Sequence, residues 1–288
     1  MAVLALFQFE PYCSRECGAG VISALSPHHT IELITRHDLL IEKLLRFDMV
    51  IFPGGRGDAS DFQQLLKTRK PVIQSYLDQG GTYLGICMGA YWADSAYFDL
   101  IGDARCVQYI TQPKAEIRRS FPTTVRAEWN GKAEKFYFFD GCAFVGSDPV
   151  LEIHARYANG DPMAVVKDKV GLIGCHLESE LDWYTSKEMK ASWHGLSHHR
   201  LLAEFVDDLL RRRSPDKMKS GDLAKPFNKV DSDNIKSGQH YLNTELDILK
   251  NALQEIEQET SIFTQGTFKK INEIARRALK AQPAPNEG

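Results

Sequence analysis

The sequence predicts an α/β fold with a mostly parallel central sheet, followed by a C-terminal helical extension. Short apolar or β-branched runs at residues 2–9, 29–34 and 47–52 alternate with segments whose apolar residues have helical spacing. This alternation is typical of βαβ units, in which a helix connects two parallel strands. The chain has 288 residues, of which 43% are hydrophobic and 25% charged, so it has room for one sizeable domain plus an extension or for two small domains.

The first half of the chain is predicted to contain four strands with helices between them. The apolar run at 2–9 is stopped by Glu10 and Pro11 and has no basic segment before it, so it is interpreted as a buried strand rather than a signal peptide. Helices are expected at 14–26, 37–47 and 59–79. Gly80 and Gly81 follow the last of these as helix-terminating residues, and a fourth strand, "GTYLGI", comes next.

The second half is predicted to be richer in antiparallel sheet. Its short strands are separated by "WNGK" and "ANGD", and Asn-Gly is the preferred pair for two-residue hairpin turns. Helices are expected at 181–192 and 198–212. The domain is therefore predicted to span residues 1–213.

A linker and a helical tail are predicted beyond this domain. Residues 214–238 are polar, contain Pro, Gly and Lys, and show no sustained period, which favours a linker. Within the tail at 239–288 a heptad-like spacing is kept by Leu242, Leu246, Leu249, Leu253, Ile256 and Phe263. Such a helix either folds back on its own domain or pairs with a second copy or another partner.

Charge and cysteine content argue against several classes of protein. A net charge of −3 gives no general attraction to nucleic acid, and the basic run at 211–213 ends a predicted helix, where cations suit the helix dipole. The six cysteines include no C-x-x-C pair, which argues against a disulfide framework or a structural zinc site. With no membrane span evident, we expect a cytoplasmic protein.

Cys87 is the first candidate for chemistry. It is the centre of "GICMG", between the predicted strand 81–86 and a predicted helix, "AYWADSAYF". A free cysteine is usually a small buried hydrophobe. However, G-x-C-x-G at a strand-to-helix junction is the thiol form of the nucleophile elbow, in which both glycines avoid clashes and the helix N-terminus favours the thiolate.

A base and its orienting group are predicted in "VGLIGCHLESE". The run 170–174 has the character of a buried strand, so His176 emerges at its end with Glu178 on the same side. A cysteine nucleophile needs such a pair, although a histidine is also often structural. The alternative, a metal site combining His176 with the histidines at 194, 198 and 199, is the less favoured interpretation.

An oxyanion-binding loop is predicted at "FPGG". The strand ending at Phe52 breaks into Pro53, Gly54 and Gly55, and the glycine amides are able to turn toward a bound ligand. In an open α/β sheet this loop and the Cys87 turn both lie at the carboxyl ends of strands, where ligands bind.

These motifs, in this order, resemble the class I glutamine amidotransferase-like superfamily over residues 1 to about 213. "FPGGRGDASDF", "GGTYLGICMGAYWAD" and "ARYANGDPMAVVKDKVGLIGCHLESE" look similar to the family named for the N-terminal domain of eukaryotic biotin–protein ligases, which also occurs as standalone proteins. The resemblance implies a flavodoxin-like three-layer sandwich. No biotin-ligase catalytic domain is visible in the sequence.

The resemblance also implies a mechanism. Cys87 would attack the side-chain amide of glutamine, His176 would move the proton and Glu178 would orient His176. The backbone N–H groups of Gly55 and Met88 would hold the oxyanion, with Gly54 beside them. The released ammonia would pass to a synthase partner, and neither a cofactor nor a metal is implied.

Two positions depart from the superfamily pattern. Tyr91 stands four residues after the cysteine, where glutaminases of this superfamily commonly have a substrate-binding Gln, and Leu177 replaces the Pro of H-P-E. Three hypotheses therefore remain: a glutamine amidotransferase, a hydrolase of another amide or peptide, and a binding or regulatory module without turnover.

Overall fold

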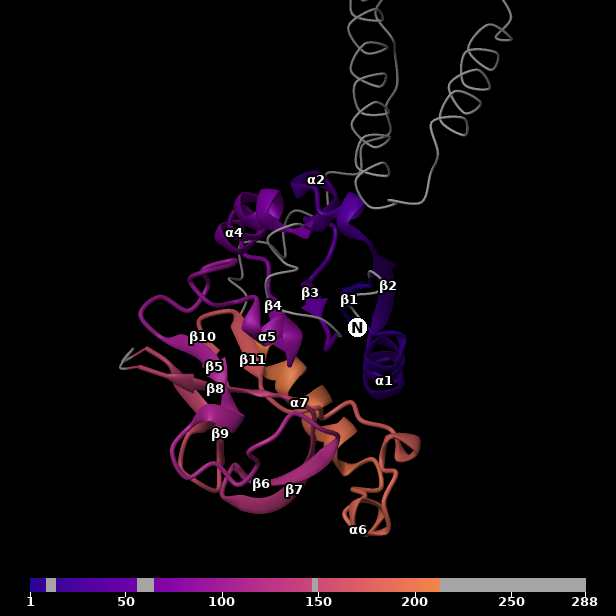
Figure 1. Ribbon diagram of the computed structural model, residues 1–288. Coiled ribbons are helices and arrows are strands. Elements are labelled where there is room, and N and C mark those ends of the chain that lie inside the picture. Colours follow the sequence, from indigo (N-terminus) through magenta and orange to yellow (C-terminus); the bar gives the residue numbers. More distant parts are fainter. Residues whose placement is uncertain (9–13, 56–64, 147–149, 213–288) are drawn as a thin grey trace, which may run out of the picture. The chain divides into compact units, whose positions relative to one another are not determined.

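The computed structural model describes residues 1–8, 14–55, 65–146 and 150–212 (Figure 1). Its strands are β1 (Val3–Phe7), β2 (Thr30–Ile34), β3 (Met49–Phe52), β4 (Tyr83–Ile86), β5 (Arg105–Gln108), β6 (Thr123–Trp129), β7 (Lys132–Phe138), β8 (Cys142–Val145), β9 (Glu152–Tyr157), β10 (Pro162–Lys167) and β11 (Val170–Ile173). The helices are α1 (Arg15–Leu25), α2 (Ile41–Leu44), α4 (Lys70–Asp78), α5 (Met88–Tyr91), α6 (Lys187–Lys190) and α7 (Ser197–Arg211), with 3₁₀ turns η1 (Arg36–Asp38), η2 (Lys67–Arg69), η3 (Tyr109–Thr111) and η4 (Leu181–Trp183).

One mixed sheet organises the part of the chain that the structure describes. Its nine strands follow the order β2-β1-β3-β4-β11-β10-β9-β6-β7, and β5 pairs with β8 in a separate small sheet. The neighbours from β2 to β11 run parallel, whereas β10, β9, β6 and β7 extend the sheet by antiparallel pairing. The predicted α/β class, with parallel strands followed by an antiparallel second half, is confirmed.

Both faces of the inner parallel strands β3, β4 and β11 are buried at every position, and β1 is buried except at Val3. The edge strand β2 exposes Thr30, Glu32 and Leu33. In β1, Leu4 and Leu6 join one core while Ala5 and Phe7 join the other, as the alternation of side chains along a strand requires. The first core also contains the inner faces of α1 and α7, and the second contains those of α2 and α4. The helices therefore cover the sheet on both faces and produce the three predicted layers (Figure 1).

The hairpin and helix-end predictions are confirmed. Asn130 and Gly131 both have positive φ, 49° and 81°, and they connect β6 to β7. Gly160, with φ of 93°, lies in the turn between β9 and β10. Gly80 has φ of 85° just after α4, where a left-handed residue ends a helix.

Three predicted helices are shorter in the structure. The helix expected at 37–47 is divided into η1 and α2, because Leu39 and Leu40 leave the helical region with ψ of 65° and 139°. In place of a helix over 181–192 there are η4 and α6, because Tyr184 leaves the helical region, with ψ of 86°, and its buried hydroxyl is 3.0 Å from Ser179 Oγ. The helix expected after Cys87 ends at Tyr91. The carboxylate of Asp94 accepts the backbone N–H groups of Ala96 and Cys106, which favours a turn over a continuing helix.

The predicted linker at 214–238 and tail at 239–288 lie outside the described residues. The chain divides into two units, residues 1–221 and residues 222–288. In the described part, no helix combines the length and the apolar character that crossing a bilayer requires.

Candidate active site

Cys87 occupies a strained turn between β4 and α5. Its backbone has φ of 50° and ψ of −105°, a conformation that residues other than glycine rarely adopt. Its N–H donates to the carbonyl oxygen of Ile173 at 2.8 Å, which holds the turn against the end of β11. This is the strand-to-helix geometry that the G-x-C-x-G pattern predicts.

The two glycines of that pattern are required by close backbone packing. A Cβ on Gly85 would lie 2.5 Å from the carbonyl oxygen of Gly89, and a Cβ on Gly89 would lie 2.6 Å from the carbonyl carbon of Phe52. Any larger residue would move α5 away from β3 and β4. The sequence therefore contains glycine where the turn approaches its neighbours, as predicted.

His176 and Glu178 form a buried pair just after β11. The Nδ1 atom of His176 is 2.8 Å from Oε1 of Glu178, and the backbone N–H of His176 donates to the carbonyl oxygen of Tyr137 at 3.1 Å. Helix α1 comes so close that a Cβ on Gly20 would lie 3.1 Å from Cγ of Glu178. The imidazole is thus fixed both through its ring and through its backbone.

The charges around His176 raise its pKa well above its ordinary value. Burial alone would lower the pKa, but the carboxylate of Glu178, the charge of Cys87 and the nearby Cys17 all favour the protonated ring. An imidazolium beside a cysteine can both stabilise a thiolate and donate a proton.

Cys87 and His176 line the same cavity, which has a volume of about 270 Å³. Gly55 also lines it. The remaining walls are formed by Ser14, Glu16, Cys17, Pro122, Tyr137, Phe139, Trp183 and Thr185. The structure therefore brings three sequence-predicted site residues together in a small, largely aromatic chamber.

Gly54 and Met88 lie beside the cavity rather than among its lining residues. A Cβ on Gly54 would lie 2.6 Å from Cε1 of His176 and 2.8 Å from Sγ of Cys17, so glycine makes room for both side chains. Met88 is buried and is the first residue of α5, directly after Cys87.

Tyr91 is not among the residues that line this cavity. Its hydroxyl donates to the carbonyl oxygen of Asp140 at 3.1 Å, and its ring packs against the core formed with α2 and α4. Burial and the neighbouring Cys142 raise its pKa above the ordinary value, so it remains a neutral donor. The structure thus gives Tyr91 a packing role, and its predicted contact with substrate stays a prediction.

Cys17 is a site residue that the sequence analysis missed. It lies in the first turn of α1, where Ser14 Oγ accepts its N–H at 3.1 Å, and its Sγ is 4.0 Å from Nδ1 of His176. Burial raises its thiol pKa, with Glu178 adding to the shift. The sequence did contain an indication of this position. Helix α1 follows strand β1, so its first turn begins at the same edge of the sheet as the Cys87 turn.

The other histidines form a separate cluster. Nε2 of His199 is 3.1 Å from the carbonyl oxygen of Ser179, and Nε2 of His198 is 2.9 Å from Oε2 of Glu134. The group of potential metal ligands that the described residues bring within 4.8 Å of one another is instead Cys17, His176 and Glu178.

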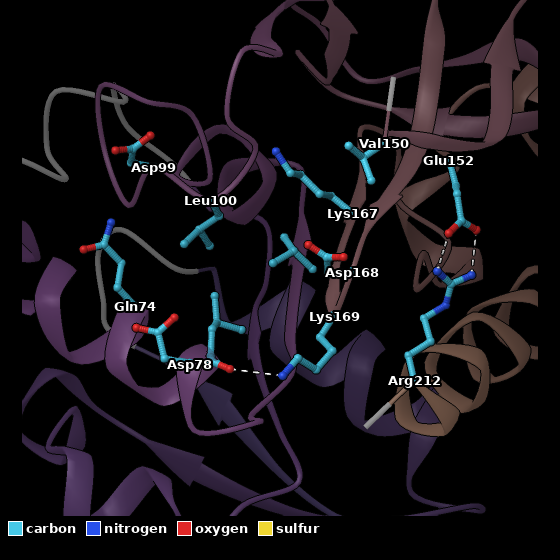
Figure 2. Close-up of a pocket in the computed structure, with 12 residues that line it drawn as sticks. Gln74, Asp78, Asp99, Leu100, Val150, Glu152, Lys167, Asp168, Lys169 and Arg212 are labelled. Carbon is cyan, nitrogen blue, oxygen red and sulfur yellow. Dashed lines mark hydrogen bonds and ion pairs between the residues drawn. The ribbon is translucent and has the colours of Figure 1, made fainter. Parts of the chain in front are cut away.

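A larger cleft of about 810 Å³ lies elsewhere, among charged side chains (Figure 2). Arg212 forms a two-pronged ion pair with Glu152 at 2.7 and 2.8 Å, and Lys169 Nζ donates to the carbonyl oxygen of Leu77. Neither cysteine nor histidine is among the described residues that line this cleft. Because the described residues that line this cleft offer no thiol or imidazole, we place the candidate active site at Cys87.

A model of a known protein family matches part of the chain. Residues 10–105 match the sequence model of the family described as "Biotin-protein ligase, N terminal". That segment contains the Pro53-Gly54-Gly55 loop and Cys87, whereas His176 and Glu178 lie beyond it. A comparison with curated proteins found no match.

Solved structures with a similar fold include several glutamine amidotransferases. One crystal structure of a glutamine amidotransferase has 17% identity and a TM-score of 0.52, with 73% of this chain and 100% of that chain covered. A glutamine amidotransferase from Thermotoga maritima has 12% identity and a TM-score of 0.53, covering 73% and 98%. PurLQS from Thermotoga maritima has 15% identity and a TM-score of 0.52, covering 73% and 100%. The chain therefore has the class I glutamine amidotransferase-like fold, and within that fold its residues 10–105 match the biotin–protein ligase N-terminal family.

Proposed function

We propose that the protein hydrolyses the side-chain amide of glutamine through a thioester on Cys87. The observation that carries the proposal is one shared cavity: Cys87, at its strained turn, and His176, paired with buried Glu178, both line it. Nucleophile, base and orienting carboxylate are the three parts that thiol-dependent acyl transfer needs.

The first step forms a bond between the sulfur of Cys87 and the amide carbon. The negative charge that develops on the amide oxygen is held by the backbone N–H groups of Gly55 and Met88. His176, held protonated by Glu178 and the Cys87 thiolate, then gives its proton to the amide nitrogen. The carbon–nitrogen bond breaks and ammonia leaves.

The second step hydrolyses the thioester. Neutral His176 takes a proton from a water molecule, which attacks the thioester carbon, and the carbon–sulfur bond breaks to release glutamate and the Cys87 thiolate. In this proposal ammonia passes to a synthase partner, as the resemblance to glutamine amidotransferases implies.

The walls of the cavity favour a second candidate reaction, hydrolysis of a bulkier amide or a peptide. Tyr137, Phe139 and Trp183 line the same cavity as the thiol, and aromatic walls suit an apolar group attached to the amide better than the polar backbone of free glutamine. The catalytic steps would be the same, with an amine as the leaving group.

An ammonia-release assay tests the proposal. Full-length protein is assayed with glutamine, with asparagine and with a panel of amides and short peptides, in parallel with Cys87→Ala. Cys106→Ala serves as the matched control, because this buried thiol lies in β5 and is not among the cavity residues. We expect wild type and Cys106→Ala to release ammonia from glutamine and Cys87→Ala to release none.

The other outcomes separate the alternatives. Turnover of a peptide or bulky amide, but not of glutamine, would support the second candidate. A glutamine-analogue electrophile gives an independent readout, because mass spectrometry would locate the adduct on Cys87. If no substrate is turned over and no adduct forms, the protein is a binding module rather than an enzyme.

A further inference from the structure

We propose that Cys17, His176 and Glu178 form a binding site for Zn²⁺ that shares His176 with the catalytic residues. The three ligand atoms come from two separate parts of the chain, Cys17 from α1 and the other two from the segment after β11. They all lie within 4.8 Å of one another. This proposal revises the sequence-based expectation that the site holds no metal.

The ligand types and spacing suit zinc. Thiolate, imidazole and carboxylate are its usual protein ligands, at bond lengths of about 2.0–2.3 Å in a tetrahedral arrangement, which places ligand atoms about 3.3–3.7 Å apart. The Sγ atom of Cys17 is 4.0 Å from Nδ1 of His176, and that nitrogen is 2.8 Å from Oε1 of Glu178. The Sγ atom of Cys17 and the Glu178 carboxylate are within 4.8 Å of each other. Side-chain movements of up to about 1 Å would let an ion sit between the three.

The second oxygen of Glu178 is an independent indication of a ligand. The Glu178 side chain is fully buried, and Oε2 has no hydrogen-bond partner among the described residues. A buried carboxylate oxygen without a partner is unfavourable by about 1–3 kcal/mol, which a cation beside it would offset. The pairing with His176 satisfies one carboxylate oxygen and leaves the other to a ligand.

Charge balance favours a divalent ion in this buried position. Binding would release the thiol proton of Cys17 and the proton shared by His176 Nδ1 and Glu178. Thiolate, neutral imidazole, carboxylate and Zn²⁺ together carry no net charge, as a buried site requires. Cys17 and His176 line the 270 Å³ cavity, which gives an ion access and leaves room for water as a fourth ligand.

A bound ion would switch off the proposed reaction, and this consequence rests on the proposed function. With zinc bound to Nδ1 of His176, the hydrogen bond between Nδ1 and Glu178 is lost. The other ring nitrogen, Nε2, is the one left to act with Cys87, and it carries the remaining proton. It is then unable to accept a proton from water in the second step. Zinc is therefore expected to inhibit turnover.

Direct metal binding tests the site without needing activity. The full-length protein, freed of metal by a chelator, is titrated with Co²⁺, and a thiolate-to-cobalt absorption band reports a sulfur ligand. Zn²⁺ affinity is then measured by competition with a chromogenic chelator. We expect one Co²⁺ per chain with this band, and a loss of at least about 100-fold in Zn²⁺ affinity in Cys17→Ser.

Two matched cysteine variants make the test specific. Cys87→Ser changes the other cavity thiol, and Cys106→Ser changes a buried thiol in β5 that is not among the cavity residues. Both variants are expected to keep the band and the affinity. The proposal is overturned if wild type binds no Co²⁺, if Cys17→Ser keeps the band, or if either control loses it.

X-ray absorption at the zinc edge of the wild type supplies a measurement that does not depend on folding of a variant. The expected first shell contains one sulfur, with nitrogen and oxygen atoms completing it. A shell without sulfur, or with two sulfurs, would contradict the proposed ligand set. All these readouts are independent of turnover, so an inactive protein that binds zinc at Cys17 would refute the proposed function and leave the metal site intact.

Discussion

The Nδ1 atom of His176 and Oε1 of Glu178 are 2.8 Å apart with both side chains buried, although the two residues are separated by only one position in the chain. Leu177 between them is also fully buried, so the peptide is fixed on both sides. In the proposed reaction this carboxylate determines which ring nitrogen carries the proton.

Replacement of Glu178 by Gln is therefore expected to slow turnover strongly. The amide keeps the size of the side chain but removes the charge that holds His176 protonated, and loss of general acid–base function typically lowers kcat by about 10²–10⁴-fold. Steady-state kinetics on the best substrate would measure this. Glu180→Gln makes the same chemical change outside the cavity and should leave kcat unchanged. Equal kcat in Glu178→Gln and wild type would contradict the role of the carboxylate.

Two glycines of α1 should respond oppositely to alanine. At Gly20 the added Cβ would clash with the backbone carbonyl of Glu178, which would force helix and loop apart and destabilise the fold by about 1–3 kcal/mol or more. At Gly18 the nearest atom is Oε1 of Gln8 at 3.6 Å, an ordinary contact, so alanine should stabilise the helix by about 0.5–1 kcal/mol. Urea unfolding of both variants checks the difference, and a destabilised Gly18→Ala would show that the packing argument fails.

Tyr91→Phe separates packing from substrate binding. The change deletes the hydrogen bond to the Asp140 carbonyl and keeps the ring, so the free energy of unfolding should fall by about 1 kcal/mol. Because Tyr91 is not among the residues that line the cavity, KM should stay at the wild-type value. A clear rise in KM with unchanged stability would instead favour the substrate contact that the sequence comparison predicts.

His194 should make the fold less stable in mild acid. Burial, together with the positive charges of His198 and His199 when protonated, lowers its pKa to about 3, from an ordinary value of about 6.5. Below pH 6.5 the unfolded chain therefore binds a proton that the folded chain does not. The free energy of unfolding should fall with decreasing pH until the pH approaches the folded value. Because solvent screens this partly exposed ring, the fall should stay below about 1.4 kcal/mol per pH unit.

The variant His194→Gln isolates this contribution. Denaturant unfolding of wild type and variant is compared between pH 7.5 and pH 5, so that the effects of His198, His199 and Glu134 are common to both. The variant should show the shallower dependence on pH. Parallel curves would mean that His194 is protonated equally in the folded and unfolded chain.

Much of the fold was predictable because short, continuous stretches of the sequence specify its strands, helices and turns. Apolar runs in β1, β3 and β4 alternate with amphipathic segments, and Asn130-Gly131 specifies a tight hairpin. The Cys87 turn was also recognisable, since its glycines are required by neighbours that the strand-to-helix connection itself brings close.

The parts that escaped prediction depend on contacts between distant segments. Cys17 meets His176 across 159 positions of the chain, and only the packing of α1 at the sheet edge brings them together. The helical spacing of residues 181–192 is overridden at Tyr184, whose burial and contact with Ser179 break the helix. In both cases tertiary packing, rather than local propensity, determines the outcome.

The connection from β7 to β8 lies outside the segment at 10–105 that matches the family model, yet it contacts residues inside that segment. Its Phe139 carbonyl oxygen lies 3.7 Å from Sγ of Cys87, and its Asp140 carbonyl accepts the hydroxyl of Tyr91, so residues outside the matched segment at 10–105 form the surroundings of residues inside it. The proposed attacking group and the three aromatic walls of its cavity, Tyr137, Phe139 and Trp183, are therefore encoded in different segments. Substitutions in the later segment can change the compound accepted while the earlier segment, and any classification based on it, stays the same.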